Sequence, residues 1–255
     1  ETGLEECDAM IAAEAASNAR LSIVAQNRFT TPIWNLKRLL DDGHLGRLLH
    51  TQINSYWWRG RPYYDLWWRG TWEQEGGGCT LNHAVHHIDM MLWIAGHPTE
   101  VMAMMGNVAH DNAEVEDISM AILDYGDRRF GQITSSVVHH GQRQEIILQG
   151  ERARASAPWI VDASQTAPNG FPEHDAAYEH ELEARMAEYG TLTHEGHAGQ
   201  IKDVLDSIVS DRAPVVTSTD GRAAIELITS IYKAGTTGSR VFFRYRQTIG
   251  NGNHY

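Results

Sequence analysis

Four segments between residues 99 and 149 alternate apolar and polar side chains with a period of two. They are VMAMMGNVA, EDISMAILDY, RRFGQITSSVV and RQEIILQG, separated by turn residues near Asp111, Gly126 and Gly141. Strands joined by such short turns pair antiparallel, because a parallel connection needs a crossover of a dozen or more residues. The sequence therefore predicts an open, mainly antiparallel sheet.

Helical and further strand patterns surround these four segments. Helices are predicted over residues 4–17, 32–43, 80–95, 173–189, 195–211 and 219–235, and strands over 20–25, 47–56 and 240–245. Residues 57–75 and 156–172 are predicted to be loops, and residues 250–255 a mobile tail. A large antiparallel sheet with helices gathered on one face is an α+β fold. Because both sheet faces carry apolar residues, we expect a second copy to cover the open face, giving a homo-oligomer (dimer or tetramer).

The charge balance and the cysteine count limit the partners and the location. Lys plus Arg number 21 and Asp plus Glu number 33, for a formal net charge of −12. Binding to polyphosphate or anionic lipid needs a cationic surface, so we expect neither nucleic acid nor a membrane as partner. No run of eighteen apolar residues is long enough to span a bilayer. The two cysteines, Cys7 and Cys79, cannot form a disulfide framework, which favours a cytoplasmic protein.

The segment from Gly76 to Gly96 contains the best candidates for chemistry. Three glycines precede a predicted helix, where they permit close backbone approach and expose free N–H groups. On that helix Asn82, His86, Asp89 and Trp93 form one narrow stripe. His86 is the best general acid/base, because imidazole titrates near neutral pH. A polar helix side that simply meets solvent would give the same pattern.

Two other histidines on this segment suggest a metal site as an alternative. His83 and His87 stand four residues apart, as in a zinc half-site. The segment lacks the HExxH glutamate, and no third ligand is indicated by spacing. We therefore expect no bound metal.

Aromatic residues are concentrated in residues 56–72, where arginines lie between them. The rings are Tyr56, Trp57, Trp58, Tyr63, Tyr64, Trp67, Trp68 and Trp72. Such rings stack on the apolar face of a sugar, and Arg59 or Arg69 could reach a pocket beside them. The alternative is a loop that its aromatic side chains hold against the core, with arginines stacked on the rings.

The first residues have the order of the end of an αβ unit, with a helix at 4–17 feeding a strand at 20–25. Two such elements cannot form a sheet alone, so we expect that an upstream part of this unit is missing. Asn27 and Arg28 follow the strand end, which is where ligands bind in open α/β sheets. The chain contains no GxGxxG or GxxxxGK[ST] motif.

In combination, these segments resemble the Gfo/Idh/MocA family of NAD(P)-dependent oxidoreductases. The resemblance rests on NRF, GHLGR, WRGTW, GGGCTLNHAVHHIDMMLWIAG, VEDISMAILDYGDRRFGQI and the stretch from AGQIKDV to TTGSRV, and it covers about residues 3–243. It implies a Rossmann domain followed by an α+β domain of the glyceraldehyde-3-phosphate dehydrogenase-like C-terminal type. Residues 1–27 would then be the last helix and strand of the first domain, residues 28–245 the substrate-binding and oligomerisation domain, and 246–255 a tail.

The resemblance also implies roles for single residues. His86 would be the acid/base for the hydroxyl being oxidised, and Asn82 its helper or a substrate contact. Asp89 matches a further recurrent position, and we place it with Arg69, Trp72 and His197 on the substrate side. Asn27 and Arg28 are expected on the side of the cofactor, which is NAD or NADP. The family's Glu-Lys-Pro motif and its glycine-rich phosphate loop are absent from the chain.

The function expected from this resemblance is hydride transfer between NAD(P) and a hydroxyl carbon of a sugar, cyclitol or related polyol. This chain would be the substrate domain of that dehydrogenase. It is expected to be inactive alone, because no acid/base residue replaces the hydride carrier. Two rival hypotheses are a non-catalytic sugar-binding or assembly module, and a metal-dependent sugar isomerase or hydrolase using His83 and His87.

Overall fold

A nine-stranded open sheet forms one layer of the protein, which is described here for residues 3–243 of a computed structural model. The strands are β1 (Leu48–Tyr56), β2 (Glu100–Gly106), β3 (Ile118–Asp124), β4 (Phe130–Ser136), β5 (Gln144–Gly150), β6 (Ala153–Ala157), β7 (Ile160–Thr166), β8 (Pro172–His174) and β9 (Val241–Phe242). Their order is β8-β7-β6-β5-β1-β4-β3-β2-β9. Only β1 and β4 pair parallel among the described strands, so the predicted mainly antiparallel sheet is confirmed.

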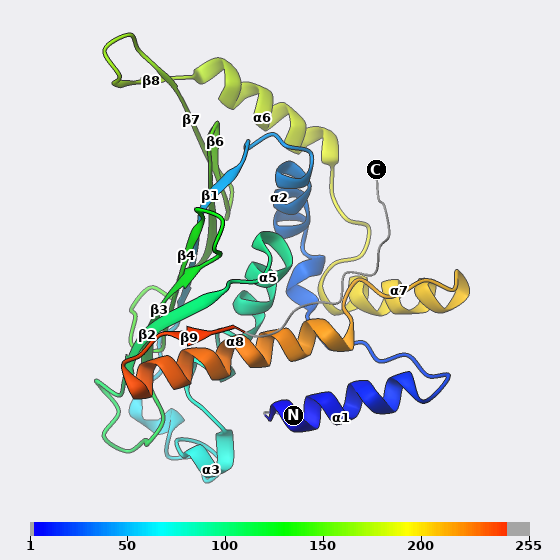
Figure 1. Cartoon of the computed structure of the whole chain (residues 1–255), viewed down its shortest axis with the longest axis vertical. Coiled ribbons are helices and arrows are strands. Elements are labelled where there is room, and N and C mark those ends of the chain that lie inside the picture. Colours follow the sequence, from blue (N-terminus) through cyan, green and yellow to red (C-terminus); the bar gives the residue numbers. More distant parts are fainter. Residues whose placement is uncertain (1–2, 244–255) are drawn as a thin grey trace.

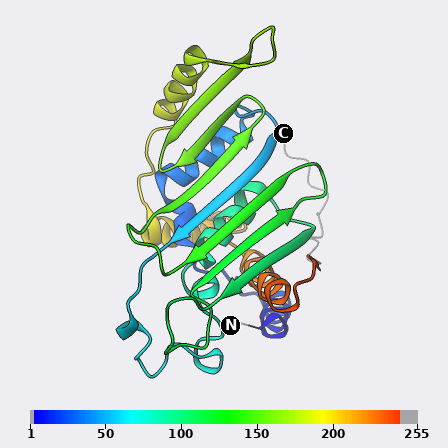
Figure 2. The same cartoon turned by 90° about the vertical axis from the view of Figure 1, so that its left-hand side faces the viewer.

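The helices lie on one face of this sheet (Figures 1 and 2). They are α1 (Leu4–Ala15), α2 (Thr31–Asp41), α3 (Trp72–Glu75), α4 (Cys79–Asn82), α5 (Val85–Ala95), α6 (Ala176–Tyr189), α7 (Gly196–Val209) and α8 (Ser218–Thr237), with 3-10 turns η1 (Gln26–Phe29) and η2 (Arg61–Tyr63). The main hydrophobic core lies between the sheet and helices α2, α5 and α8. The predicted α+β fold is therefore confirmed. None of the described helices is both long enough and apolar enough to cross a bilayer.

The centre of the sheet has a connection that the sequence did not predict. Strands β4 and β5 follow one another in the chain, yet β1 lies between them, parallel to β4 and antiparallel to β5. Ile53 of β1 is paired with Ile133 on one side and Ile146 on the other, and all three side chains are buried. Residues 137–143 are long enough to cross one strand, since neighbouring strands lie only about 4.8 Å apart.

Three local predictions were wrong. Residues 20–25 form no strand, because their backbone bonds to α7 instead: Gln200 accepts from Ala25 N and donates to Ile23 O. The helix predicted over 80–95 is split between α4 and α5, since Ala84 has ψ near −7°. The loop predicted over 156–172 contains β7 and the first residue of β8. Pro172 is tolerated there because it begins an edge strand.

The last predicted strand, 240–245, is confirmed for Val241–Phe242, and its end lies outside the described residues. The predicted tail, residues 246–255, also lies outside them.

Candidate active site

The three glycines before α4 allow a close contact with two other elements of the fold. A Cβ atom on Gly78 would lie 2.0 Å from the Glu116 carbonyl oxygen, and one on Gly77 would lie 2.2 Å from the Tyr232 hydroxyl. The buried Glu116 carboxylate accepts hydrogen bonds from Gly78 N and Thr80 N, both at 2.9 Å. The glycines therefore serve packing, and two of the N–H groups expected to be free are already bonded.

His86 lies in the first turn of α5 and lines a cavity of about 140 Å³. The cavity lies between α1, residues 21–25, α5 and α8, and its walls are mainly apolar, from side chains that include Met10, Ile11, Ile23, Val85, Ala224 and Ile225. Within residues 3–243 the imidazole makes no hydrogen bond. Burial lowers the pKa of His86, the Asp89 carboxylate opposes this shift, and His197 adds to it. The ring is therefore a mostly neutral base that faces a hollow.

Arg28 and Asp89, which were predicted to contact cofactor and substrate, are bound to each other. Arg28 is fully buried, and its Nε and Nη2 donate to the two carboxylate oxygens of Asp89 at 2.8 and 2.6 Å. Arg28 Nη2 also lies 3.3 Å from Asp220 Oδ1 at the start of α8. Burial raises the pKa of Asp89, even though Arg28 acts in the opposite direction. This ion pair ties η1 to α5, one turn beyond His86.

The other predicted site residues do not all converge on the His86 cavity. Asn27 lines a separate cleft of about 320 Å³, together with His87 and Gln144. His197 is exposed at the start of α7, within electrostatic range of His86. Asn82, on α4, is exposed and donates its amide to Gly77 O at 2.7 Å and to Glu75 Oε1 at 3.3 Å. Arg69 and Trp72 belong to the loop described next.

Residues 57–75, the aromatic loop, pack through their own rings. The Arg69 guanidinium lies 4.0 Å from the ring centres of both Tyr63 and Trp68. Trp72 meets Tyr232 edge to face at 5.3 Å, and Trp67 is 85% exposed. Part of the aromatic loop is therefore packed through its own rings, and Trp67 is exposed to solvent.

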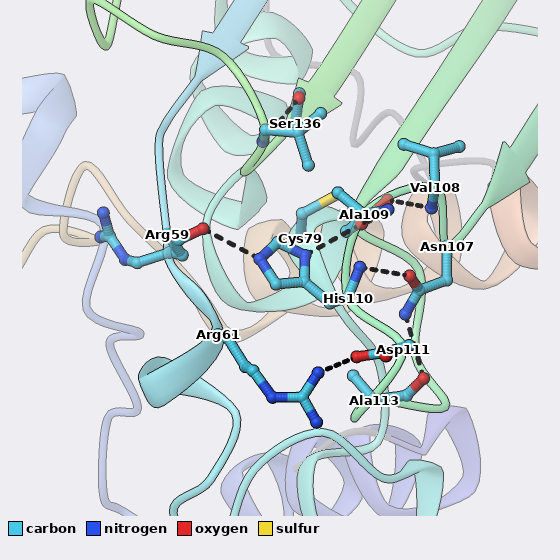
Figure 3. Close-up of polar contacts among 12 residues, drawn as sticks. Arg59, Arg61, Cys79, Asn107, Val108, Ala109, His110, Asp111, Ala113 and Ser136 are labelled. Carbon is cyan, nitrogen blue, oxygen red and sulfur yellow. Dashed lines mark hydrogen bonds and ion pairs between the residues drawn. The ribbon is translucent and has the colours of Figure 1, made fainter.

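A second loop, residues 107–113, anchors the start of the aromatic loop (Figure 3). His110 Nε2 donates to the Arg59 carbonyl oxygen at 2.9 Å, and Arg61 forms an ion pair with Asp111. His110 is itself buried and contacts Asp117 Oδ2 through Nδ1 at 2.9 Å. The first residues of the aromatic loop, Arg59 and Arg61, are thereby held against residues 107–113.

His83 and His87, the residues of the metal hypothesis, have other partners. His87 Nδ1 lies 3.0 Å from Ser55 Oγ, and His83 Nε2 lies 3.4 Å from the Tyr63 hydroxyl. Burial lowers the pKa of each to about 4. Across residues 3–243 there is no group of three or more His, Cys, Asp or Glu side chains able to hold a metal ion.

Several residues that shape this region were missed from the sequence, namely Glu75, Glu116, Gln200, Asp220 and Tyr232. Their partners lie between 5 and more than 100 residues away, and sequence spacing does not reveal such contacts. Glu116 offered one signal, because it and Asp117 are two adjacent acidic residues directly before the apolar strand β3.

Comparison with known proteins agrees with this architecture. A sequence profile described as the GFO/IDH/MocA C-terminal domain matches residues 33–156. Residues 33–156, nearly half of the chain, are therefore similar to a Gfo/Idh/MocA C-terminal domain. Helix α1 precedes the matched residues in the chain, and helices α6, α7 and α8 follow them.

This chain is also similar to two curated proteins, one named as an oxidoreductase and one as a hydratase. It is 28% identical over 105 residues to the oxidoreductase YteT of Bacillus subtilis, which is 40% of this chain and 24% of that protein. It is 25% identical over 153 residues to 2,7-anhydro-N-acetylneuraminate hydratase of Mediterraneibacter gnavus, 58% of this chain and 40% of that protein. The matches thus span less than half the length of these relatives.

Solved structures share the fold over nearly the whole chain. The WlbA dehydrogenase of Bordetella pertussis, in complex with NADH and UDP-GlcNAcA, is 25% identical with a TM-score of 0.76, covering 96% of this chain and 70% of that one. An aldose-aldose oxidoreductase of Caulobacter crescentus, complexed with glycerol, is 20% identical with a TM-score of 0.74, covering 94% and 69%. The second likeness supports the fold alone.

Proposed function

We propose that this chain is the substrate domain of an oxidoreductase that transfers a hydride between NAD(P) and a hydroxyl carbon of a sugar, cyclitol or related polyol. The observation that carries the proposal is His86: it lines a cavity, it has no hydrogen-bond partner among the described residues, and its pKa is lowered. A neutral imidazole accepts the proton of a hydroxyl group as that carbon is oxidised. The sugar ligands and substrates named for WlbA and for the hydratase support the substrate class.

We propose roles for the other predicted site residues as well. Asn82 would bind a substrate hydroxyl, since its side chain is exposed beside the first turn of α5. Asp89 and Arg28 fix the helix that carries His86. Arg69 and Trp72 would form the outer wall of the substrate site, and His197, on α7, lies within electrostatic range of His86.

The described residues do not fit the phosphates of a dinucleotide. The Glu116 carboxylate already accepts from Gly78 N and Thr80 N at the glycine turn, and the described residues contain no βα unit with a glycine-rich loop. We therefore propose that NAD or NADP is bound by a separate dinucleotide-binding domain to which residues 1–27 belong. Two observations on this segment support the proposal. None of the side chains of α1 is buried, and Val24, which lies after that helix, is 61% exposed. This chain alone would then be inactive, and calorimetry with NADH should show no tight binding.

The test of the function is His86→Asn in the intact protein that includes the cofactor domain. Loss of general acid/base catalysis should lower kcat by about 10²–10⁴-fold. Cofactor affinity should stay nearly unchanged, because His86 is proposed to contact the substrate hydroxyl. Unchanged turnover would contradict the assignment.

We also propose a homo-oligomer formed through the open face of the sheet. Met102, Met104, Met120 and Ile122 are 46–80% exposed there, while Ala121 and Leu123, which alternate with them, are buried. Met104→Lys should shift the sedimentation coefficient to that of a monomer. A wild-type chain that sediments as a monomer at all concentrations would contradict the proposal.

A cytoplasmic location, proposed from the two cysteines in 255 residues, is testable by fractionation.

A further inference from the structure

Glu75 stands at the end of α3, where the aromatic loop meets α4. Its side chain is only 4% exposed. Oε1 accepts from Arg69 Nη1 at 2.7 Å and from Asn82 Nδ2 at 3.3 Å, and Oε2 accepts from Gly70 N at 2.6 Å. One carboxylate therefore connects the loop to the side chain that the proposed function places against a substrate hydroxyl.

These contacts fix the orientation of the Asn82 amide. Its two neighbours are the Glu75 carboxylate and the Gly77 carbonyl oxygen, and both groups only accept hydrogen bonds. The NH₂ end must face them, so its two hydrogens are both used. Oδ1 is left for a ligand, and it can only accept a hydrogen bond.

The same carboxylate orders the loop. Arg69 lies between the rings of Tyr63 and Trp68, and its ion pair with Glu75 holds the guanidinium in that stack. The Tyr63 hydroxyl in turn lies 3.4 Å from His83 Nε2, at the residue after Asn82. The aromatic loop and the end of α4 are thus linked at two points, Asn82 and His83.

We propose that Glu75 is a positioning residue that presents Asn82 to a substrate hydroxyl as a hydrogen-bond acceptor and holds the aromatic loop against α4. The first part rests on the proposed function, and the contacts themselves do not. A direct consequence is that the residue at position 82 depends on the residue at position 75. An aspartate at position 82 would face the Glu75 carboxylate and the Gly77 carbonyl, three acceptors with no donor between them.

The first measurement is NMR of the 255-residue chain labelled with ¹⁵N-asparagine. The two signals of the Asn82 side-chain NH₂ group, the Asn82 pair, are identified because they are missing from the spectrum of Asn82→Asp. Glu75→Gln should shift this pair, because its carboxylate acceptor is lost, whereas Glu73→Gln, an exposed acid on the same short helix, should leave it in place. An Asn82 pair that Glu75→Gln does not move would overturn the proposal.

The second measurement uses thermal unfolding and remains decisive if Glu75→Gln fails to fold. Asn82→Asp should lower the Tm relative to the wild type by about 2–4 °C more at pH 8 than at pH 5, because the carboxyl group introduced at position 82 repels its neighbours least where that new group is protonated. The double variant Glu75→Gln/Asn82→Asp should recover part of this loss, since the amide introduced at position 75 can donate to the new carboxylate. Equal Tm losses at both pH values would contradict the coupling.

The third measurement is titration of the chain with myo-inositol, followed by NMR. Glu75→Gln should weaken binding by about 2- to 10-fold, the effect of one misplaced hydrogen bond, while Glu73→Gln should not. If the wild type binds no polyol, the proposed substrate class loses support, and the first two measurements still decide the role of Glu75. Equal affinity of wild type and Glu75→Gln would refute the positioning role.

Discussion

Removal of the Arg28 guanidinium should be among the most destabilising single changes in this chain. Arg28→Met keeps the volume of the side chain but leaves the Asp89 carboxylate buried without its partner. Arg28 and Asp89 are only 1% and 7% exposed, so solvent screens little of the interaction. Breaking a buried pair costs about 3–5 kcal/mol, and the Tm should fall by about 6–20 °C, at about 2–4 °C per kcal/mol for a domain of this size.

The loss should depend on pH in a defined direction. Burial raises the pKa of Asp89, and removing Arg28 should raise it further. A carboxyl whose pKa is raised in the folded state binds more protons there than in the unfolded chain, so stability falls as pH rises above the unfolded value of about 3.9. The stability difference between Arg28→Met and wild type should therefore be larger at pH 7.5 than at pH 4.5.

Urea unfolding followed by circular dichroism measures both effects. Arg47→Met is the matched control, because Arg47 forms an ion pair with Glu151 in which both side chains are nearly half exposed, and such pairs contribute about 0–1 kcal/mol. Arg28→Met/Asp89→Leu should regain part of the loss, although Asp220 stays without its arginine. If Arg28→Met were no less stable than Arg47→Met, or its loss were independent of pH, the reasoning would be refuted.

Two further predictions concern His86 and the glycine turn. Asp89→Asn should lower the pKa of His86 and His197→Gln should raise it, because the two groups act on the imidazole with opposite signs. NMR titrations of the His86 ring protons measure both pKa values. Shifts of the two pKa values in the same direction would contradict the described environment of His86. Gly78→Ala should cost about 1–3 kcal/mol or more in urea unfolding, because its Cβ would meet the Glu116 backbone, whereas Gly106→Ala, with no atom within 4 Å of its Cβ, should change stability little.

The alternating strands and the amphipathic helices could be predicted because their signal is local. Strands β2 to β5 and helices α2, α6, α7 and α8 lie within a few residues of the predicted ranges. The insertion of β1 between β4 and β5 could not be predicted, because β1 pairs with β4 across about 80 residues of chain and no local pattern indicates that pairing. Residues 20–25 have the composition of a strand, but no strand of the described chain lies beside them, and Gln200 bonds to Ala25 N and Ile23 O instead.

The candidate site could also be predicted only in part, because single residues were indicated but their pairings were not. The sequence indicated His86, Asn82, Asp89 and Arg28 one by one, from helical spacing, from a strand end and from a family resemblance. It could not show that Arg28 and Asp89 are partners across 61 residues, or that Asn82 is held by Glu75. Such pairings depend on tertiary packing, which also determines which side chain remains available for a ligand.

The pH dependence of kcat in the intact protein tests the central claim most directly. If His86 accepts the hydroxyl proton, the oxidation rate should fall as pH drops through its lowered pKa, with an inflection below the ordinary value of about 6.5. The account predicts that this inflection is lost in His86→Asn, along with most of the activity. An inflection that persists unchanged in His86→Asn, or one that lies above the ordinary histidine value in the wild type, would contradict it.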